Sequence, residues 1–418
     1  MSLIDKVKRK VWEAVQKLVP HNAHYRPKNV YIDAAAYLAA HPNSGVKRHL
    51  IFDKYESKLD VTRRFYEKLS GYITYDDVDM KPENPIFRTV NDYVVVEIPN
   101  GRMVSNNLDL IAAITADGCV LGDVSYHQSP TKRVNPKDSK IMSQNWFNDP
   151  EVVEGNVFSL LAGGGAAINY GHWLVDALPR LELLEKAGLL GTIDKVVVPA
   201  YKHDYHRQSL AAYGIGPEKI IVADANTHIK AQNLILSSHP RGNRSYVVPR
   251  WIPELHRARF LKPEWLGADD FPELVYVSRK DSSIRQVVNE EELMEKLTPL
   301  GFKSFELAKL DFHQKVALFN KARVVISASG AGLNNMMFCE PGVIFFEIFP
   351  QGLVHTQFYN LAKYQDTKYH FMVCEPQKES KTIKQGRHEH TYVPPAEFSQ
   401  VLDGVMHQYN KAKAAPKS

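Results

Sequence analysis

Residues 323–338 read RVVISASGAGLNNMMF, and this stretch sets the fold class. The mostly apolar residues 323–327 have the length of a buried strand, the glycines within 330–332 make a turn, and 334–338 are expected to form a short helix. Small residues let a backbone approach a ligand closely, and the first amides of a helix have no acceptor inside it. Strand, glycine turn and helix in this order are typical of an open α/β sheet that binds a ligand at its edge.

The same alternation continues on both sides of this stretch. Further strands are predicted at 274–277, 302–305 and 343–349. Helices are predicted to begin at Asn289 and Asp311, each followed three residues later by Glu or Gln in a capping-box pattern. The strand at 343–349 is almost wholly apolar, as expected where helices cover both faces of a sheet. Residues 246–375 are therefore predicted to form a Rossmann-like domain.

The N-terminal part of the chain shows two patterns. Short apolar runs separated by turn dipeptides predict antiparallel hairpins over 92–126. A weaker alternation follows, with helices predicted at 171–187 and 204–213 and strands at 196–198, 220–222 and 234–236. The sequence thus predicts an α/β protein with two Rossmann-like domains around a central cleft. The first domain spans 21–245, and the hairpins form a small antiparallel extension of it.

Composition and charge limit the class of protein. Of 418 residues, 44% are hydrophobic and 24% are charged, which is ordinary for a globular protein and argues against disorder. Basic residues exceed acidic ones by only 52 to 47, so no concentrated basic face and no nucleic-acid partner are expected. Cys119, Cys339 and Cys374 show neither CxxC nor Cys/His spacing, so the sequence predicts neither a disulfide framework nor a zinc site.

The two ends of the chain carry weaker signals. Residues 1–20 predict a basic amphipathic helix, and residues 3–19 could lie on an anionic membrane surface or pack on the protein itself. Residues 376–418 predict a C-terminal helix followed by a disordered tail. Without an apolar stretch of about eighteen residues or a secretory leader, we expect a cytoplasmic protein, which residues 3–19 could bring to the inner face of the plasma membrane.

Basic residues follow the first strand of the C-terminal domain. Arg279, Lys280 and Arg285 come after 274–277, and cations at the carboxyl end of a strand can neutralise a diphosphate. They are expected to face the same crevice as the glycine turn, which predicts a phosphate site. The spacing matches neither a dinucleotide fingerprint nor a P-loop. Glu347 interrupts an apolar run, so it either accepts hydrogen bonds from ribose hydroxyls or pairs with an arginine.

A second constellation lies in 169–180, NYGHWLVDALPR. His172, Asp176 and Arg180 recur every four residues and should share one helix face. A base, a carboxylate and a cation are what proton abstraction from a sugar hydroxyl needs. Asp176 could be the base or could orient His172, and Arg180 could keep the carboxylate ionised. The alternative is a polar network that only holds the helix in place.

Two other clusters suggest metal ligands. Asp77 and Asp79 spell D-x-D, a pattern that can hold a divalent ion through a diphosphate, but they are far in sequence from the phosphate elements. His388, Glu389 and His390 lie in a charged segment before the last helix, where they are expected to face solvent. Because neither cluster is placed at the predicted ligand sites, we expect no essential metal and no cofactor.

Three segments resemble glycosyltransferase family 61. Residues 169–181, NYGHWLVDALPRL, match its N-Y-x-H-W-x-x-D-x-x-P-R pattern, and 278–293, SRKDSSIRQVVNEEEL, resemble its arginine stretch. Residues 310–338 resemble its Q…F..A..I…HGAGL.N block. The likeness covers about residues 90–350. The family contains plant xylosyl- and arabinosyltransferases, animal N-acetylglucosaminyltransferases and bacterial capsular polysaccharide proteins.

The resemblance implies a GT-B-like fold, a nucleotide-sugar donor that is usually UDP-linked, and inversion at the anomeric carbon. It places His172 and Asp176 on the acceptor side. The donor-binding residues that we predict are Arg279, Lys280, Arg285, Ser329, Gly330, Ala331, Gly332, Leu333, Asn334 and Glu347. Ser329 stands where many members have histidine, which leaves a different donor or an inactive member open.

The function predicted from the sequence is that of an inverting, metal-independent glycosyltransferase. It would move a sugar from a nucleotide-sugar to an oligosaccharide or lipid-linked glycan in bacterial capsule, exopolysaccharide or lipopolysaccharide synthesis, with Asp176, His172 and Arg180 as the catalytic residues. The alternatives are a non-catalytic carbohydrate-binding or assembly member of the same fold, and another nucleotide-sugar enzyme such as an epimerase.

Overall fold

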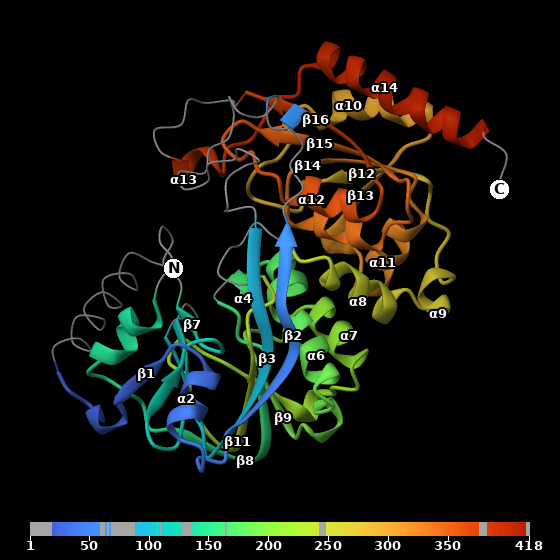
Figure 1. The fold of residues 1–418 in the computed structure, drawn as a ribbon. Helices are drawn as coiled ribbons and strands as arrows, with labels where there is room; N and C mark the ends of the chain where they lie inside the picture. The colour runs from blue at the N-terminus through green and yellow to red at the C-terminus, as the bar shows by residue number, and fades with distance from the viewer. Residues whose placement is uncertain are drawn as a thin grey trace. The chain divides into compact units, whose positions relative to one another are not determined.

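The computed structural model describes residues 19–58, 63–64, 67, 88–106, 108, 110–127, 135–163, 165–241, 248–375 and 383–414. The chain divides into two units, which are described one at a time (Figure 1). Unit 1 is Met1–Tyr55 with Val90–Asn243, and unit 2 is Glu56–Thr89 with Arg244–Ser418. Apart from residues 19 and 20, the predicted N-terminal helix lies outside the described residues, and so does the D-x-D pattern at 77–79.

Unit 2 is built on a parallel sheet of five strands. They are β12 (Leu274–Ser278), β13 (Lys303–Glu306), β14 (Val324–Ala328), β15 (Ile344–Pro350) and β16 (Lys368–Cys374). The strand order is β13-β12-β14-β15-β16 with every pair parallel, which is the 2-1-3-4-5 order of a doubly wound fold. The four predicted strands are confirmed. The sequence analysis missed β16, whose half-exposed residues KYHFMVC carry no clear apolar run.

Helices cover this sheet. They are α8 (Trp251–Phe260), α9 (Pro263–Leu266), α10 (Glu290–Leu297), α11 (Phe312–Lys321), α12 (Gln357–Tyr364), α13 (Ile383–Gly386) and α14 (Pro395–Ala414), with 3-10 segments at Thr298–Leu300, Leu307–Lys309 and Ala331–Phe338. α14, red in Figure 1, packs against β15 and β16 through Phe398, whose ring stacks on Phe346. α14 continues to Ala414, so the tail predicted to be disordered is helical up to that residue.

The two predicted caps have different outcomes. At α11, Asp311 accepts from the Gln314 amide and the Gln314 side chain accepts from Asp311, so this capping box is confirmed. At α10, the side chain of Asn289 makes no cap bond. It bonds instead to the backbone of Val393 and to the Glu292 carboxylate, so the second capping-box prediction was wrong.

Unit 1 contains an 11-stranded mixed sheet. Its main path is β1-β6-β5-β4-β11-β8-β9-β10, and β2, β3 and β7 pair alongside it. The strands are β1 (Asn29–Tyr31), β2 (Lys47–Lys58), β3 (Arg88–Pro99), β4 (Arg102–Asn106), β5 (Leu110–Ile114), β6 (Cys119–Leu121), β7 (Tyr126–His127), β8 (Glu151–Ser159), β9 (Lys195–Val198), β10 (Ile220–Val222) and β11 (His228–Ser237). A mixed α/β architecture is thereby confirmed.

The predicted antiparallel extension is part of this sheet. β11 pairs antiparallel with β3 and β4 along its two halves and parallel with β8. The hairpin strands and the parallel strands β11-β8-β9-β10 therefore share one hydrogen-bonded sheet, and only the latter four resemble the predicted Rossmann-like unit. Within those four, β8, β9 and β10 follow one another outward, while β11 returns to the other side of β8.

The helices of unit 1 are mostly short. They are α2 (Ala34–Ala40), α4 (Gly165–Ile168), α5 (Tyr170–His172), a π-helical turn (Trp173–Ala177), α6 (Pro179–Lys186) and α7 (Asp204–Ala211), with 3-10 segments at Ala23–Tyr25, Pro136–Asp138, Lys140–Ser143, Leu190–Thr192 and Pro217–Lys219. The single helix predicted over 171–187 is thus broken into three parts. Across both units, no described helix combines the length and the apolar content that a membrane crossing requires.

Candidate active site

The first candidate cluster lies in unit 1 where β8 and β11 end. These neighbouring parallel strands form the point at which the strand order reverses, and ligands of open α/β sheets bind at such points. The chain leaves β8 into α4 and α5. Asn169 begins α5, because its side-chain oxygen accepts from the amides of Gly171 and His172 at 2.8 and 3.3 Å. This cap sets the direction in which His172 leaves the helix.

The π turn that follows α5 changes which side chains share a face. Leu178 donates its amide to the carbonyl of Trp173, five residues back, so one residue is inserted into the helical turn. Pro179 accounts for the wide turn, since it has no amide hydrogen and its ring would clash with a carbonyl four residues earlier. Asp176 stays beside His172, but the inserted residue rotates Arg180 away from them.

Asp176 joins His172 to an arginine from the end of β11. Arg241 donates to both carboxylate oxygens of Asp176, from Nε to Oδ1 and from Nη2 to Oδ2, each at 2.6 Å. The second oxygen also lies 2.6 Å from Nδ1 of His172. The side chains of Arg241 and Asp176 are 5% and 12% exposed, whereas that of His172 is 42% exposed. The ion pair is therefore buried, and only the imidazole is open to solvent.

The charges of this cluster determine which atoms of Asp176 and His172 carry a proton. Burial alone would raise the pKa of Asp176, but the charge of Arg241 and the hydrogen bonds from His172 and Arg241 outweigh it and hold that pKa well below its usual range. The carboxylate is ionised and can only accept, so Nδ1 of His172 carries a proton. Nε2 then holds the lone pair of the ring. Because both oxygens of Asp176 are engaged, His172 is the group that can take a proton.

A glycine keeps the imidazole in place. A Cβ built on Gly165 would lie 2.9 Å from Cδ2 and 3.2 Å from Nε2 of His172, closer than side chains normally allow. Gly165, the first residue of α4, therefore packs against the ring, and its lack of a side chain leaves space for the imidazole.

Arg180 belongs to a neighbouring network rather than to the Asp176 pair. Its guanidinium donates to the carbonyl of Ser237 at 3.3 Å and to the ring of His239 at about 3 Å. Burial lowers the pKa of Arg180 to about 10, and burial beside that cation also lowers the pKa of His239 well below its usual value. The expectation that Arg180 holds Asp176 ionised is corrected, since Arg241 makes that contact.

Sequence reasoning missed Arg241 because it is 65 residues from Asp176 along the chain. One signal could have found it. Arg241 follows closely on the apolar strand predicted at 234–236. The sequence analysis treats basic residues after strand 274–277 as ligand contacts, and the same rule applied here would have selected Arg241.

The second candidate cluster lies in unit 2 at the ends of β12 and β14. In the 2-1-3-4-5 order these two strands form the reversal point of the sheet. Arg279 follows β12 and its guanidinium lies over Gly330, which follows β14. A Cβ at Gly330 would be 1.8 Å from Nη1 of Arg279, so glycine is required for this approach. The structure thus brings together the basic loop and the glycine turn, as the sequence analysis expected.

The loop after β12 holds Arg279 through its own backbone. The guanidinium donates to Ser282 Oγ and to the carbonyls of Ile284 and Arg285, at 3.0–3.2 Å. No carboxylate lies within ion-pair distance of Arg279 among the residues that the structure describes. Burial, followed by the charge of Arg285, lowers its pKa to about 10, so it remains a cation at neutral pH. Arg285 itself has φ 55°, which is uncommon for a residue with a side chain.

Other predicted donor residues have different surroundings. Lys280 turns to α10, with Nζ 3.3 Å from a Glu291 oxygen and 4.0 Å from a Glu290 oxygen. Leu333 is in the core, and Asn334 bonds to the carbonyl of Ala331 and to Gln357. The partly exposed Ala331 and Gly332 form the first turn of the 3-10 helix, where amides have no acceptor inside the helix.

Glu347 is buried on β15 and accepts a hydrogen bond from the hydroxyl of Tyr369 on β16. Burial raises its pKa to about 8, and the nearby hydroxyls of Ser329 and Tyr369 limit the rise. Glu347 pairs with no arginine among the described residues, which corrects one of its two expected roles. Ser329 is buried as well, and its hydroxyl lies 3.5 Å from Nε2 of His355, which comes from the loop after β15.

The segment 388–390 serves the fold. Nδ1 of His390 accepts from the amide of Gln286, and the carbonyl of His388 accepts from the amide of Arg285. These residues do not group as metal ligands in the described part of the chain.

Comparison with known proteins adds the family. The model of the family described as Glycosyltransferase 61 matches residues 170–346, which include both His172 and the Arg279 loop. A beta-1,2-xylosyltransferase of rice, Oryza sativa subsp. japonica, is 31% identical over 252 residues, or 55% of this chain and 41% of that protein. The match thus spans about two fifths of the length of this relative. Over residues 170–346 the chain is therefore similar to the glycosyltransferase 61 family.

Proposed function

We propose that the protein is an inverting glycosyltransferase that moves a sugar from a nucleotide-sugar to a carbohydrate hydroxyl. The observation that carries the proposal is the His172–Asp176–Arg241 set, in which a buried ion pair orients an exposed imidazole. The division of labour would be of the GT-B kind, with unit 2 binding the donor and unit 1 supplying the base. The match of residues 170–346 to the model of the glycosyltransferase 61 family supports this chemistry.

Unit 2 has the features of a diphosphate site. Arg279 is a cation with no carboxylate within ion-pair distance among the described residues, with Asp281 as a more distant negative charge, and Gly330 lets the backbone come close to the group that the guanidinium binds. The amides of Ala331 and Gly332 begin a helix, and a helix N-terminus attracts anions. We propose that these groups bind the diphosphate of a UDP-linked sugar, with Arg285 as a second cation. Their positive charge would allow the leaving diphosphate to depart without an essential metal ion.

The proposed reaction is a single displacement. Nε2 of His172 takes the proton of the acceptor hydroxyl while its oxygen forms a bond to the anomeric carbon. The bond from that carbon to the diphosphate oxygen breaks on the opposite face, and Arg279 stabilises the charge that the diphosphate gains. Asp176 stabilises the imidazolium that forms, and Arg241 keeps Asp176 ionised. The sequence analysis left the base open between Asp176 and His172, and the proposal now assigns that role to His172.

The choice of donor and acceptor follows from the chemistry of the two clusters and from the rice relative. Because the rice relative is a xylosyltransferase by name, we propose UDP-xylose as the first donor to test. We propose an oligosaccharide or lipid-linked glycan acceptor, in bacterial capsule, exopolysaccharide or lipopolysaccharide synthesis. The basic pattern of residues 3–19 supports a reaction at the cytoplasmic face of a membrane.

A donor screen tests the proposal. UDP-, GDP- and CMP-sugars are added to the purified chain, and thermal stabilisation, release of the nucleotide (UDP, GDP or CMP) and transfer to glycan acceptors are measured. We expect one donor class to stabilise the chain and to be consumed faster with acceptor, with inversion of the anomeric configuration. Binding without turnover would favour a non-catalytic member, and isomerised donor without acceptor an epimerase. Absence of any nucleotide binding would contradict the proposal.

A further inference from the structure

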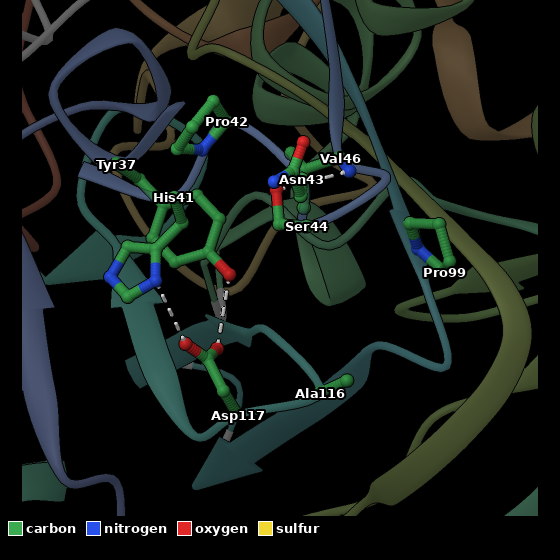
Figure 2. A pocket seen from close by; sticks show the side chains of 9 residues that line it. All are labelled: Tyr37, His41, Pro42, Asn43, Ser44, Val46, Pro99, Ala116 and Asp117. Carbon is green, nitrogen blue, oxygen red and sulfur yellow. Dashed lines mark hydrogen bonds and ion pairs between the residues drawn. The ribbon is translucent and has the colours of Figure 1, made fainter. Parts of the chain in front are cut away.

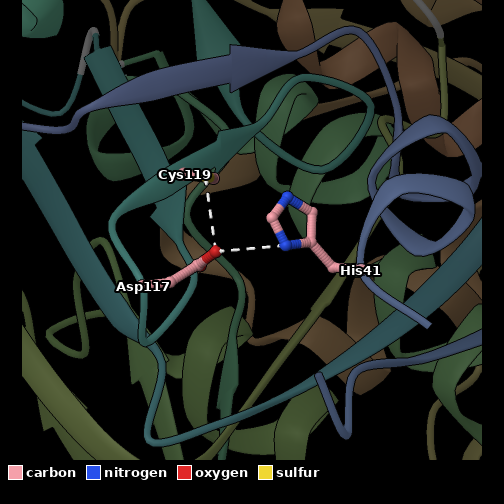
Figure 3. Close-up of side chains that lie close together, drawn as sticks. All are labelled: His41, Asp117 and Cys119. Atoms are coloured by element: carbon pink, nitrogen blue, oxygen red, sulfur yellow. Dashed lines mark hydrogen bonds and ion pairs between the residues drawn. The ribbon is translucent and has the colours of Figure 1, made fainter. Parts of the chain in front are cut away.

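A second cluster of ligand-type side chains lies in unit 1, away from the residues used above. Asp117 lies in the turn between β5 and β6, Cys119 is the first residue of β6, and His41 is the residue that ends α2. One nitrogen, one oxygen and one sulfur of these side chains lie within 4.8 Å of one another, and no other such set occurs in the described residues. Figure 3 shows the three side chains converging from two elements.

Two of the three distances between the ligand atoms match those of a tetrahedral metal site, and the third, from the nitrogen of His41 to Sγ of Cys119, is within 4.8 Å. Nδ1 of His41 is 3.6 Å from Oδ2 of Asp117, and Sγ of Cys119 is 3.7 Å from the same oxygen. With metal–N and metal–O bonds of about 2.1 Å and a metal–S bond of about 2.3 Å, tetrahedral angles give edges of about 3.4 Å and about 3.6 Å. The two edges to Asp117 need shifts of only a few tenths of an ångström to hold an ion, and the edge between His41 and Cys119 has to be about 3.6 Å.

Outer hydrogen bonds already orient two of the ligands. Nε2 of His41 lies 2.9 Å from the hydroxyl of Tyr31, which leaves Nδ1 to face Asp117. The other oxygen of Asp117, Oδ1, accepts from Tyr37 at 3.1 Å and from Thr115. The ring of Tyr37 also stacks on His41, with centroids 4.6 Å apart. Second-shell bonds of this kind fix the tautomer and the direction of metal ligands.

We propose that His41, Asp117 and Cys119 bind a zinc-type divalent cation, with water as its fourth ligand. Thiolate and imidazole favour borderline-soft ions over Mg²⁺ or Ca²⁺. His41 and Asp117 also line a surface pocket with Tyr37, Asn43 and Ser44, so one side of the ion is open (Figure 2). The bond from Sγ replaces the S–H bond, and the proton leaves to solvent. The ion would join the hairpin β5–β6 to the end of α2.

The test uses the whole purified chain after treatment with a chelator. Zn²⁺ is titrated by calorimetry, and Co²⁺ is added separately to look for thiolate-to-metal charge-transfer absorption. We expect one equivalent of Zn²⁺ to bind and to raise Tm, and Co²⁺ to show the thiolate band. No binding by the wild-type chain, or binding by Cys119→Ser with unchanged affinity, would overturn the proposal.

Matched variants separate the site from general effects. Cys119→Ser and His41→Ala should each weaken Zn²⁺ binding by more than about 100-fold, the upper figure for loss of an outer-shell partner, and Tyr31→Phe by about 10–100-fold. The controls Cys374→Ala and His407→Ala change the same residue types in unit 2 and should bind as the wild type does. If Cys119→Ser does not fold, Asp117→Asn decides, because Asp117 is at an exposed turn. Equal affinity in that variant would also refute the site.

Discussion

Removal of Arg241 tests the buried ion pair quantitatively. Arg241→Leu leaves the carboxylate of Asp176 buried without its cation, and breaking such a pair costs about 3–5 kcal/mol. For a domain of about 200 residues, 1 kcal/mol lowers Tm by about 2–4 °C, so the Tm of unit 1 should fall by about 6–20 °C. Circular dichroism during heating at pH 7 measures the change.

The double variant separates charge from packing. Asp176→Leu alone leaves Arg241 as an unpaired buried cation, whereas replacing both residues by leucine removes both charges. We therefore expect the double variant to regain most of the lost stability while its transferase activity stays absent, because His172 has lost its partner. The reasoning would be refuted if Arg241→Leu lowered Tm by less than about 2 °C. It would also be refuted if the stability losses of the two single variants simply added in the double variant.

Three further changes probe the other groups. His172→Gln should lower turnover about 10²–10⁴-fold and leave donor affinity unchanged. If donor affinity fell by the same factor as turnover, His172 would be a donor-binding residue and not the base. Gly330→Ala should push the Arg279 guanidinium aside and weaken nucleotide-diphosphate binding, with a small change in Tm, and calorimetry that finds unchanged affinity would contradict the close approach. Glu347 has a folded pKa of about 8, above its ordinary value of 4.5, so the folded state holds the proton more tightly and stability should fall as pH rises from about 5 to about 8. Glu347→Gln should flatten that part of the urea-unfolding profile, and an unchanged slope would count against a buried protonated carboxyl.

The fold could be predicted best where local signals agreed. In unit 2 the apolar strands, the Asp311 cap and the glycine turn at 330–332 all indicated one doubly wound sheet, and the structure confirms its strands. β16 escaped because edge strands carry little apolar periodicity. In unit 1 the hairpins were recognised, but their union with β8 through β11 depends on pairing between distant segments, which local patterns do not encode.

The candidate site could be predicted in part for the same reason. His172 and Asp176 are neighbours on one turn, so their contact follows from helical spacing. Arg180 was misplaced because the spacing rule assumes 3.6 residues per turn, and the π turn before Pro179 adds a residue. Arg241 meets Asp176 only through the sheet.

The measurement that bears most directly on the central claim is donor affinity in two variants of neighbouring residues. Calorimetric titration of a UDP-sugar is run on wild type, Arg279→Ala and Lys280→Ala. Loss of charge-assisted bonds worth about 1.5–3 kcal/mol should weaken binding about 10–150-fold in Arg279→Ala. Lys280→Ala should bind nearly as the wild type does, because Lys280 turns to the acidic residues of α10. Absence of nucleotide-sugar binding, or equal affinity in wild type and Arg279→Ala, would contradict a donor site between β12 and β14.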